Sequence, residues 1–144
     1  METPATFVDV LRSQAWRLPD LEIYRFLGDG EGITASITCA GLDRRAREIG
    51  AELQQRFPPG TRLLLMVPPG LDGIAAFFGA LCAAMVPVPL FTPSDAASLA
   101  RTQKIAADAS AAAILTTGEL AATLAKGSLH VIVADAITTS ALLW

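Results

Sequence analysis

Continuous apolar runs alternate with segments of helical length in the second half of the chain. The runs show no alternation of polar and apolar residues, and they lie at 62–67, 86–90, 112–116 and 129–134. The helical segments between and after them lie at 71–85, 95–109 and 119–126, with a last short helix to Trp144. Strands without alternation are typical of a parallel sheet covered by helices on both faces. Residues 58–144 are therefore predicted to form a βαβ sheet.

The first 57 residues follow a different pattern, which predicts a helix, a hairpin and a second helix. Residues 5–17 have apolar positions close to helical spacing, and Pro19 ends that segment. Residues 21–39 alternate with period two around the glycine-rich turn 28–32, which favours a β-hairpin. Thr38 is placed to cap a helix running to about Phe57, with one apolar face. The polar face of that helix carries Arg44, Arg45, Arg47, Glu48 and Glu52.

The helical segment 71–85 is apolar or small on all sides, and Asp72 is its only charged residue. Such a helix needs neighbours around most of its surface, so we expect it to be largely buried. The uncharged stretch 73–91 has about the length of a membrane span. Pro87 and Pro89 interrupt it, so a buried helix followed by a strand explains it better, and no membrane span is expected. Asp9 and Arg12 interrupt the N-terminus, so no signal peptide is expected either.

Composition points to a protein whose surface is partly covered by something else. The 144 residues carry a net charge of −3, scattered along the chain, which argues against binding nucleic acid or an anionic membrane. Hydrophobic residues make up 52% and charged residues 17%, with a mean hydropathy of +0.46. This excess predicts self-association, as a symmetric dimer or by exchange of an element, with the segment ending in Trp144 taking part. Cys39 and Cys82 lie in apolar stretches and are interpreted as reduced core thiols of a cytoplasmic protein.

Candidate catalytic groups are few. His130 is the only histidine, at the start of a predicted strand, and has no partners at metal-ligand spacing. A nucleophilic pair of Cys39 or Cys82 with His130 stays open as the weaker alternative to buried cysteines. The turn 28–32 carries two carboxylates, which would repel a phosphate.

The stretch Thr116-Thr117-Gly118 has the right context for an anion site, between a strand and a helix. However, no Gly-Lys-Ser/Thr follows it, and Glu119 occupies the place of the anion. Thr117 is therefore interpreted as a helix cap. The residues themselves assign no catalytic, cofactor-binding or metal-binding group, and the substrate-binding residues are unknown.

One segment carries a specific resemblance. Residues 68–81, PPGLDGIAAFFGAL, closely resemble the string PPGLDFIAAFFGCL of the fatty-acyl-AMP ligase branch of the acyl-activating, adenylate-forming (ANL) superfamily. Residues 88–93 are similar to its VPAYPP. Residues 36–46 resemble the first core motif of the superfamily, and 105–109 with 114–117 resemble a further pair of its motifs. The resemblance covers almost the whole chain in order, so we expect the first subdomain of that fold over residues 1–144.

The resemblance implies that a parent enzyme activates a fatty acid with ATP and Mg²⁺, forming acyl-AMP and pyrophosphate, and passes the acyl group to an acyl carrier protein. The parent's ATP-binding loop, its adenine and ribose motifs and its catalytic lysine have no counterpart in these residues, so none is carried over. The chain alone is expected to be inactive. Its expected roles are a scaffold, a possible wall of the acyl channel and a partner for the remainder of the ligase.

Three departures from the family pattern concern packing and capping. Cys39 stands where the family usually has Tyr. Gly41 stands where the family has the Glu of a capping box, so Thr38 keeps only its half of the reciprocal bonds. Ala84 and Met85 replace the usual Ala-Gly before the next strand. These changes are compatible with a second reading, a natural non-catalytic interaction or dimerisation module descended from such an enzyme. The third hypothesis is a small nucleotide-binding protein of Rossmann type, which is supported only by the alternation of strands and helices.

Overall fold

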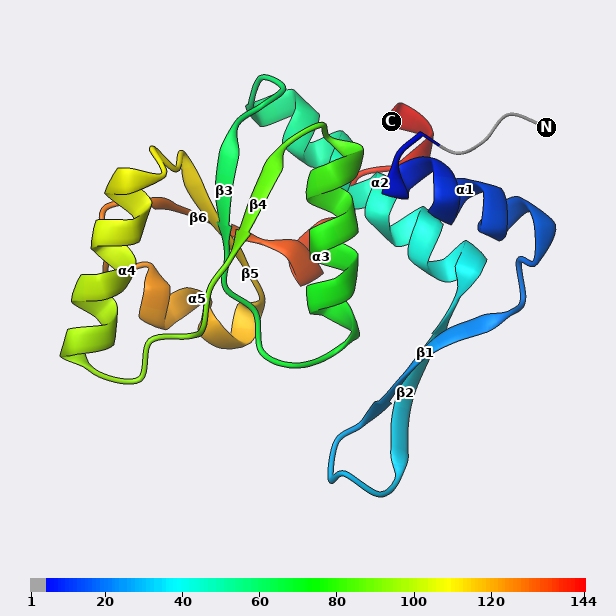
Figure 1. Cartoon of the computed structure of the whole chain (residues 1–144), viewed down its shortest axis with the longest axis horizontal. Helices are drawn as coiled ribbons and strands as arrows, with labels where there is room; N and C mark the ends of the chain where they lie inside the picture. The colour runs from blue at the N-terminus through cyan, green and yellow to red at the C-terminus, as the bar shows by residue number, and fades with distance from the viewer. Residues whose placement is uncertain (1–4) are drawn as a thin grey trace.

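The computed structural model describes residues 5–144 and confirms an α/β fold with an N-terminal hairpin (Figure 1). The hairpin forms a two-stranded antiparallel sheet, and the other strands form a four-stranded parallel sheet. The elements are α1 (Phe7–Arg17), β1 (Glu22–Leu27), β2 (Ile33–Thr38), α2 (Cys39–Arg56), β3 (Arg62–Leu65), α3 (Leu71–Cys82), β4 (Val86–Pro89), α4 (Ala96–Asp108), β5 (Ala113–Thr116), α5 (Gly118–Leu124), β6 (His130–Val133), η1 (Ala134–Ala136) and η2 (Ala141–Leu143). Residues 1–4, at the start of the predicted first unit, lie outside the described residues.

The hairpin extends away from the body of the molecule (Figure 1). Its turn is built on Asp29, whose Oδ1 accepts hydrogen bonds from the amides of Glu31 at 2.9 Å and Gly32 at 2.7 Å. Gly30, between Asp29 and Glu31, has a φ of 83°, a conformation that favours glycine. The two carboxylates of this segment therefore belong to a turn, as the sequence predicted.

The parallel sheet has the strand order β4-β3-β5-β6, so β3 and β5 are central. Pro87 and Pro89 lie on the edge strand β4, where a residue without an amide hydrogen removes no bond from a neighbouring strand. All four predicted strands are confirmed. Within residues 5–144 no helix combines the length and the apolar character needed to cross a bilayer.

Helices cover both faces of this sheet, which explains why its strands lack alternation. Leu63, Leu65 and Leu115 point to the face that α2 and α3 cover, and pack in one core cluster with residues of those helices. Leu64 and Ile114 point to the other face, where α4 and α5 supply their neighbours. Figure 1 shows α3 and α4 on opposite sides of the strands. Both sets of side chains are therefore buried, and the runs read as continuously apolar.

Helix α3 is largely buried, as predicted, with only Asp72 of its 12 residues exposed. It lies close against α2 because glycine stands at the contact. A Cβ added at Gly79 would lie 2.5 Å from Ile49 Cγ2 and 2.6 Å from Ile49 Cβ. The start of α2 is also as predicted, since the Gly41 amide donates to Thr38 Oγ1 at 3.1 Å.

The C-terminal segment 134–144 lies along α2 and contacts its polar face. Arg45 donates to the carbonyl oxygens of Ile137 at 2.8 Å and Ala134 at 2.6 Å. Arg47 donates to the Ala141 carbonyl at 3.1 Å. Trp144 packs against the core, and its Nε1 donates to the carbonyl of Cys82 at 2.6 Å. The arginines thus bind backbone groups that the sequence pattern did not connect to them.

Candidate functional site at the carboxyl ends of the strands

The order of the strands produces a switch point between β3 and β5. The chain leaves β3 for α3 on one face of the sheet, and leaves β5 for α5 on the other face. The two loops therefore diverge at the carboxyl ends of neighbouring strands. In open α/β sheets, ligands bind in the crevice that such divergence creates. Two depressions lie here, on either side of the loop 68–70, and we call them the apolar groove and the switch-point crevice.

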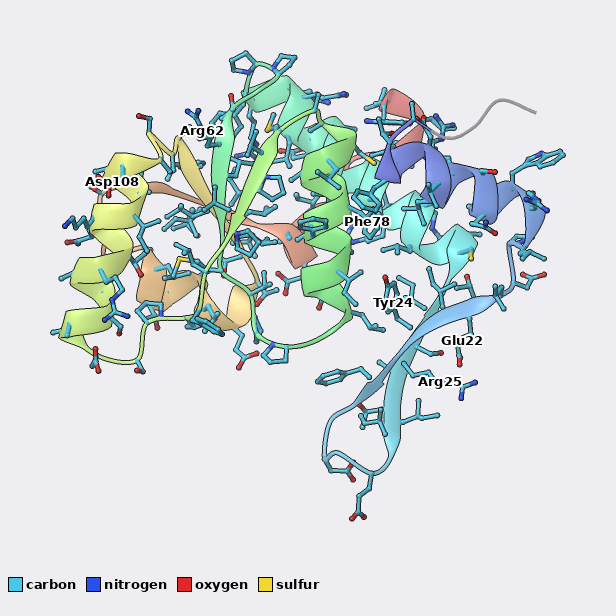
Figure 2. All side chains as sticks on the ribbon, viewed as in Figure 1. Glu22, Tyr24, Arg25, Arg62, Phe78 and Asp108 are labelled. Atoms are coloured by element: carbon cyan, nitrogen blue, oxygen red, sulfur yellow. The ribbon has the colours of Figure 1, made fainter. Side chains whose placement is uncertain are left out.

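The apolar groove has a volume of about 790 Å³ and is lined almost entirely by hydrophobic side chains. Its floor is the end of β3 with Val67, and one wall is formed by Ile74, Phe77 and Phe78 of α3. The two phenylalanine rings meet edge to face, with centroids 5.9 Å apart. The end of β4 with residues 89–92 forms the second wall, and Phe7 and Tyr24 close one end. Figure 2 shows Tyr24 near the base of the hairpin and Phe78 on α3.

Local sequence explains the shape of the groove. Pro68 and Pro69 end β3 because neither has an amide hydrogen to continue the ladder. Gly73, in the first turn of α3, lets that turn lie close to the loop, since an added Cβ would be 2.7 Å from Val67 Cγ2. No side chain projects from position 73, so the groove stays open there. The segment that singled out one family in the sequence is therefore the segment that shapes the groove.

The switch-point crevice is smaller and has a mixed polar and apolar lining, with a volume of about 270 Å³. Residues 68–72 line one side, and Thr117, Glu119 and Asp135 line the other; Phe26 and Ala35 of the hairpin complete it. Thr117 occupies the N-cap position of α5, but the predicted capping bond is absent, and its Oγ1 has no hydrogen-bond partner. The Asp135 carboxylate accepts the Gly118 amide at 2.8 Å instead. A carboxylate from η1, just after β6, thus takes the role expected of Thr117.

The remaining candidates from the sequence lie elsewhere. His130 opens β6 at the amino end of the strand, away from both depressions, and its Nε2 is 3.5 Å from Arg56 Nη1. The residues around it form a separate depression that contains no cysteine. Cys39 and Cys82 are both buried. Burial and, secondarily, the negative charge of Asp43 raise the pKa of Cys82 to about 11, so its thiol is protonated at neutral pH. The structure does not bring a cysteine and His130 together in one cavity.

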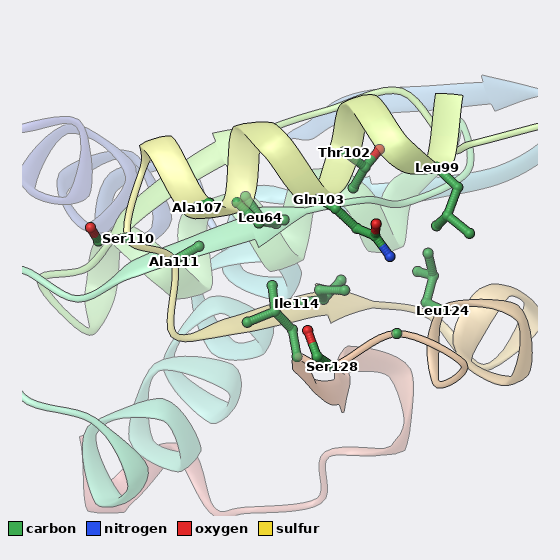
Figure 3. Close-up of a pocket in the computed structure, with 13 residues that line it drawn as sticks. Leu64, Leu99, Thr102, Gln103, Ala107, Ser110, Ala111, Ile114, Leu124 and Ser128 are labelled. Carbon is green, nitrogen blue, oxygen red and sulfur yellow. The ribbon is translucent and has the colours of Figure 1, made fainter. Parts of the chain in front are cut away.

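A further cavity lies between α4, β5 and α5, on the other face of the sheet (Figure 3). Its volume is about 270 Å³, and Leu64, Ile114 and Leu124 form its apolar walls. Gln103 extends from α4 toward Ile114 (Figure 3). Thr102 is also directed there, but its hydroxyl already donates to the Ser98 carbonyl at 3.0 Å. The cavity is mainly apolar, with a few polar side chains in its lining, and lies in the packing between helices and sheet.

Comparison with known proteins agrees with this geometry. Residues 11–142 match the AMP-binding enzyme family, and the chain belongs to that family. Within it, the similar proteins include fatty-acyl-AMP ligases, and the chain corresponds to their N-terminal part. A long-chain-fatty-acid–AMP ligase of Mycolicibacterium smegmatis is 40% identical over 101 residues, which are 68% of this chain and 16% of that protein. A medium-chain-fatty-acid–acyl-carrier-protein ligase of Moorena producens is 38% identical over 116 residues, covering 78% of this chain and 19% of that protein.

The fold comparison gives the same relationship. The crystal structure of a fatty acyl-adenylate ligase from Legionella pneumophila, in complex with acyl adenylate and pyrophosphate, superimposes with a TM-score of 0.87 at 29% identity. The match covers 95% of this chain and 25% of that chain. The chain thus spans between about a sixth and a quarter of the length of these three ligases.

Proposed function

We propose that this chain is the single N-terminal subdomain of a ligase that activates a fatty acid with ATP, forming acyl-AMP for transfer to an acyl carrier protein. The chain supplies the scaffold and one wall of the channel for the acyl chain. The observation that carries this proposal is the apolar groove at the carboxyl ends of β3 and β4. The names of the related ligases support the choice of a fatty acid as the substrate.

The chemistry of the groove suits an alkyl chain. Its lining offers side chains such as Val67, Ile74 and Phe77 and no charged group. Each methylene group buried against such a surface contributes about 0.8 kcal/mol. A carboxylate or adenylate would find no counter-charge in the groove, so the reacting end of the substrate would lie outside it. This part of the ligase therefore binds the tail of the acid and leaves the reaction to other residues.

The reaction itself would require groups beyond these residues. Stabilising the charge on ATP phosphates takes a glycine-rich loop, a lysine and Mg²⁺. The switch-point crevice presents Asp72, Glu119 and Asp135, which would repel a phosphate. Accordingly, the chain alone is inactive, and the remainder of the ligase is its natural partner. Its compartment would be the cytoplasm, consistent with two buried reduced thiols.

The groove is tested by the binding of a fluorescent long-chain fatty acid to the purified chain. Phe91, at the rim of the groove, is 98% exposed, so Phe91→Glu should leave the fold intact and weaken binding. Gly73→Phe should fill the groove and abolish binding. Ala122→Phe, on an exposed position of α5, is the matched control and should bind as the wild type does. Equal affinity in all four proteins would contradict the assignment of the groove.

A second candidate function, a natural interaction or dimerisation module, is favoured by the exposed apolar residues at the C-terminus. Leu142 is 90% exposed and Leu143 is 66% exposed. The ring of Trp144 already contacts Arg12 of the same chain, whose guanidinium carbon lies 4.8 Å from the ring centre. Trp144 should therefore contribute less to self-association than Leu142 and Leu143. Self-association should depend on the two leucines. Sedimentation should show dimers for the wild type and monomers for Leu142→Asp/Leu143→Asp; a wild type that stays monomeric at high micromolar concentration would exclude the dimerisation module.

A further inference from the structure

A second apolar depression adjoins the apolar groove. Its volume is about 340 Å³, and it lies between α1, the base of the hairpin and the first turn of α2. Phe7, Tyr24 and Phe78 line both depressions and form their common boundary. We call this second depression the α1 pocket. The three rings therefore mark the passage from the groove to further apolar space, rather than the end of that space.

The lining of the α1 pocket has the same character as that of the groove. Gln14 carries the only amide side chain in it, and no charged residue is among the lining residues. The other residues that line this pocket and not the groove are Val10, Leu11, Leu21, Ile23, Cys39 and Leu42. Such a surface favours an alkyl chain, because burying apolar groups is favourable and a buried charge without a partner is costly.

Cys39 keeps the α1 pocket open. It is a small, buried residue that lines the pocket, and it stands where the family usually has Tyr. Its backbone is fixed, because its amide donates to the Leu21 carbonyl at 2.9 Å and the Ala40 amide donates to the Pro19 carbonyl at 3.1 Å. A tyrosine ring at position 39 would occupy space that the pocket leaves free. The pocket therefore follows from a residue in which this chain departs from the family pattern.

The boundary between the groove and the α1 pocket consists of side chains that have room to move. Phe7 is 74% exposed and Tyr24 is 40% exposed. In Figure 2 the Tyr24 side chain points from the hairpin toward α3, which carries Phe78. Exposed side chains change rotamer within nanoseconds. An alkyl chain that fills the groove can therefore displace these rings and continue into the pocket.

We propose that the α1 pocket binds the distal end of a long acyl chain whose nearer part lies in the apolar groove. The inference rests on the proposed function and deepens it, since it assigns to this chain the acids that are too long for the groove alone. Cys39 is then a specificity-determining residue, because it leaves the pocket open. Each methylene group buried in the pocket should raise the affinity about fourfold.

Spin-labelled acids locate the distal end of the chain. Octadecanoic acid carrying a nitroxide at carbon 5 or at carbon 16 is added to the ¹⁵N-labelled protein, and the broadening of each amide signal is measured. The label at carbon 16 should broaden the amides of Val10, Gln14 and Leu21 most strongly, and the label at carbon 5 those of Gly73 and Ile74 in the groove. Strongest broadening in the groove with both labels would overturn the pocket and leave the proposed function intact. No broadening in either place would contradict both.

Variants that fill the pocket test its role in selecting chain length. Dodecanoic and octadecanoic acids are compared by calorimetry, and the wild type should bind the longer acid more tightly by more than about tenfold, since further methylene groups are buried. Cys39→Tyr and Gln14→Phe fill the pocket from α2 and α1, so both should remove most of this preference and leave the affinity for dodecanoic acid unchanged.

Two features keep this comparison decisive. Gln14 is half-buried at the edge of α1, so Gln14→Phe tests the pocket even if a ring at the buried position 39 prevents folding. Gln55→Phe places the same ring on an exposed position of α2 outside the pocket, and it should bind both acids as the wild type does. A folded Gln14→Phe protein that keeps the full preference for octadecanoic acid would refute the α1 pocket as the site of the distal end.

Discussion

Replacing Gly79 by alanine tests the contact that places α3, and with it one wall of the apolar groove. The added Cβ would lie 2.5 Å from Ile49 Cγ2 and 2.6 Å from Ile49 Cβ, whereas carbon atoms in good contact are about 3.5–4.0 Å apart. Ile49 is 1% exposed, so its side chain has no free space to enter. The two helices must therefore separate by a substantial part of an ångström.

The expected loss of stability follows from two opposing contributions. Overpacking of a well-packed core costs about 1–3 kcal/mol, and a contact this short belongs at the upper end. Alanine has a higher helix propensity than glycine, which stabilises the folded protein by up to about 1 kcal/mol. The free energy of unfolding should therefore fall by about 2 kcal/mol, and the melting temperature by roughly 6–8 °C for a domain of this size. Shortening Ile49 to alanine should not restore the loss, because the contact at its Cβ would remain.

The assay is urea unfolding followed by circular dichroism, with thermal melts as a second measurement. Gly118→Ala is the matched control, since its added Cβ would meet Asp135 Oδ2 at an ordinary 3.4 Å and should change stability by less than about 0.5 kcal/mol. A Gly79→Ala protein as stable as the wild type, with an unchanged urea dependence, would refute the close contact between α2 and α3.

Two further predictions concern a buried thiol and the C-terminal segment. Burial raises the pKa of Cys82 to about 11 in the folded protein, from an unfolded value of 9.0, so its contribution to stability is complete below pH 9 and is lost as pH rises toward 11. Urea unfolding across this range should show a steeper fall in the free energy of unfolding for the wild type than for Cys82→Ala. Parallel falls in the two proteins would contradict the raised pKa. Arg45→Ala removes charged donors from the Ile137 and Ala134 carbonyls, so it should lower the free energy of unfolding by about 2 kcal/mol and speed hydrogen exchange in residues 137–144. Unchanged exchange in these residues would show that Arg45 does not hold the segment in place.

The strands of the parallel sheet could be predicted because burial on both faces leaves a clear pattern. Each predicted run overlaps an observed strand, with ends that differ by at most a few residues, as for 62–67 and β3 (Arg62–Leu65). The hairpin was equally clear, since a glycine-rich turn separated two alternating segments. The apolar groove follows from a segment that the family resemblance had already singled out, residues 68–93.

Contacts between distant side chains could not be predicted. The Asp135 carboxylate binds the Gly118 amide where Thr117 was expected to cap, because local spacing cannot show that β6 ends beside β5. Arg45 and Arg47 lie on the predicted polar face of α2, and the sequence pattern did not show that both donate to the C-terminal backbone. The crevice combines two loops and the hairpin, and its acidic character appears only when the strand order is known.

The most direct test of the proposed function is a chimera. The corresponding N-terminal region of the fatty acyl-adenylate ligase from Legionella pneumophila, which superimposes on this chain with a TM-score of 0.87, is replaced by residues 1–144. Formation of acyl-AMP from ATP and a long-chain fatty acid is then measured by pyrophosphate release and by mass spectrometry, beside the isolated chain. The account predicts acyl-AMP from the chimera, a reduced yield with Gly73→Phe, and only background from the isolated chain. A folded chimera that binds ATP but forms no acyl-AMP with any fatty acid, or an isolated chain that forms it unaided, would contradict the account.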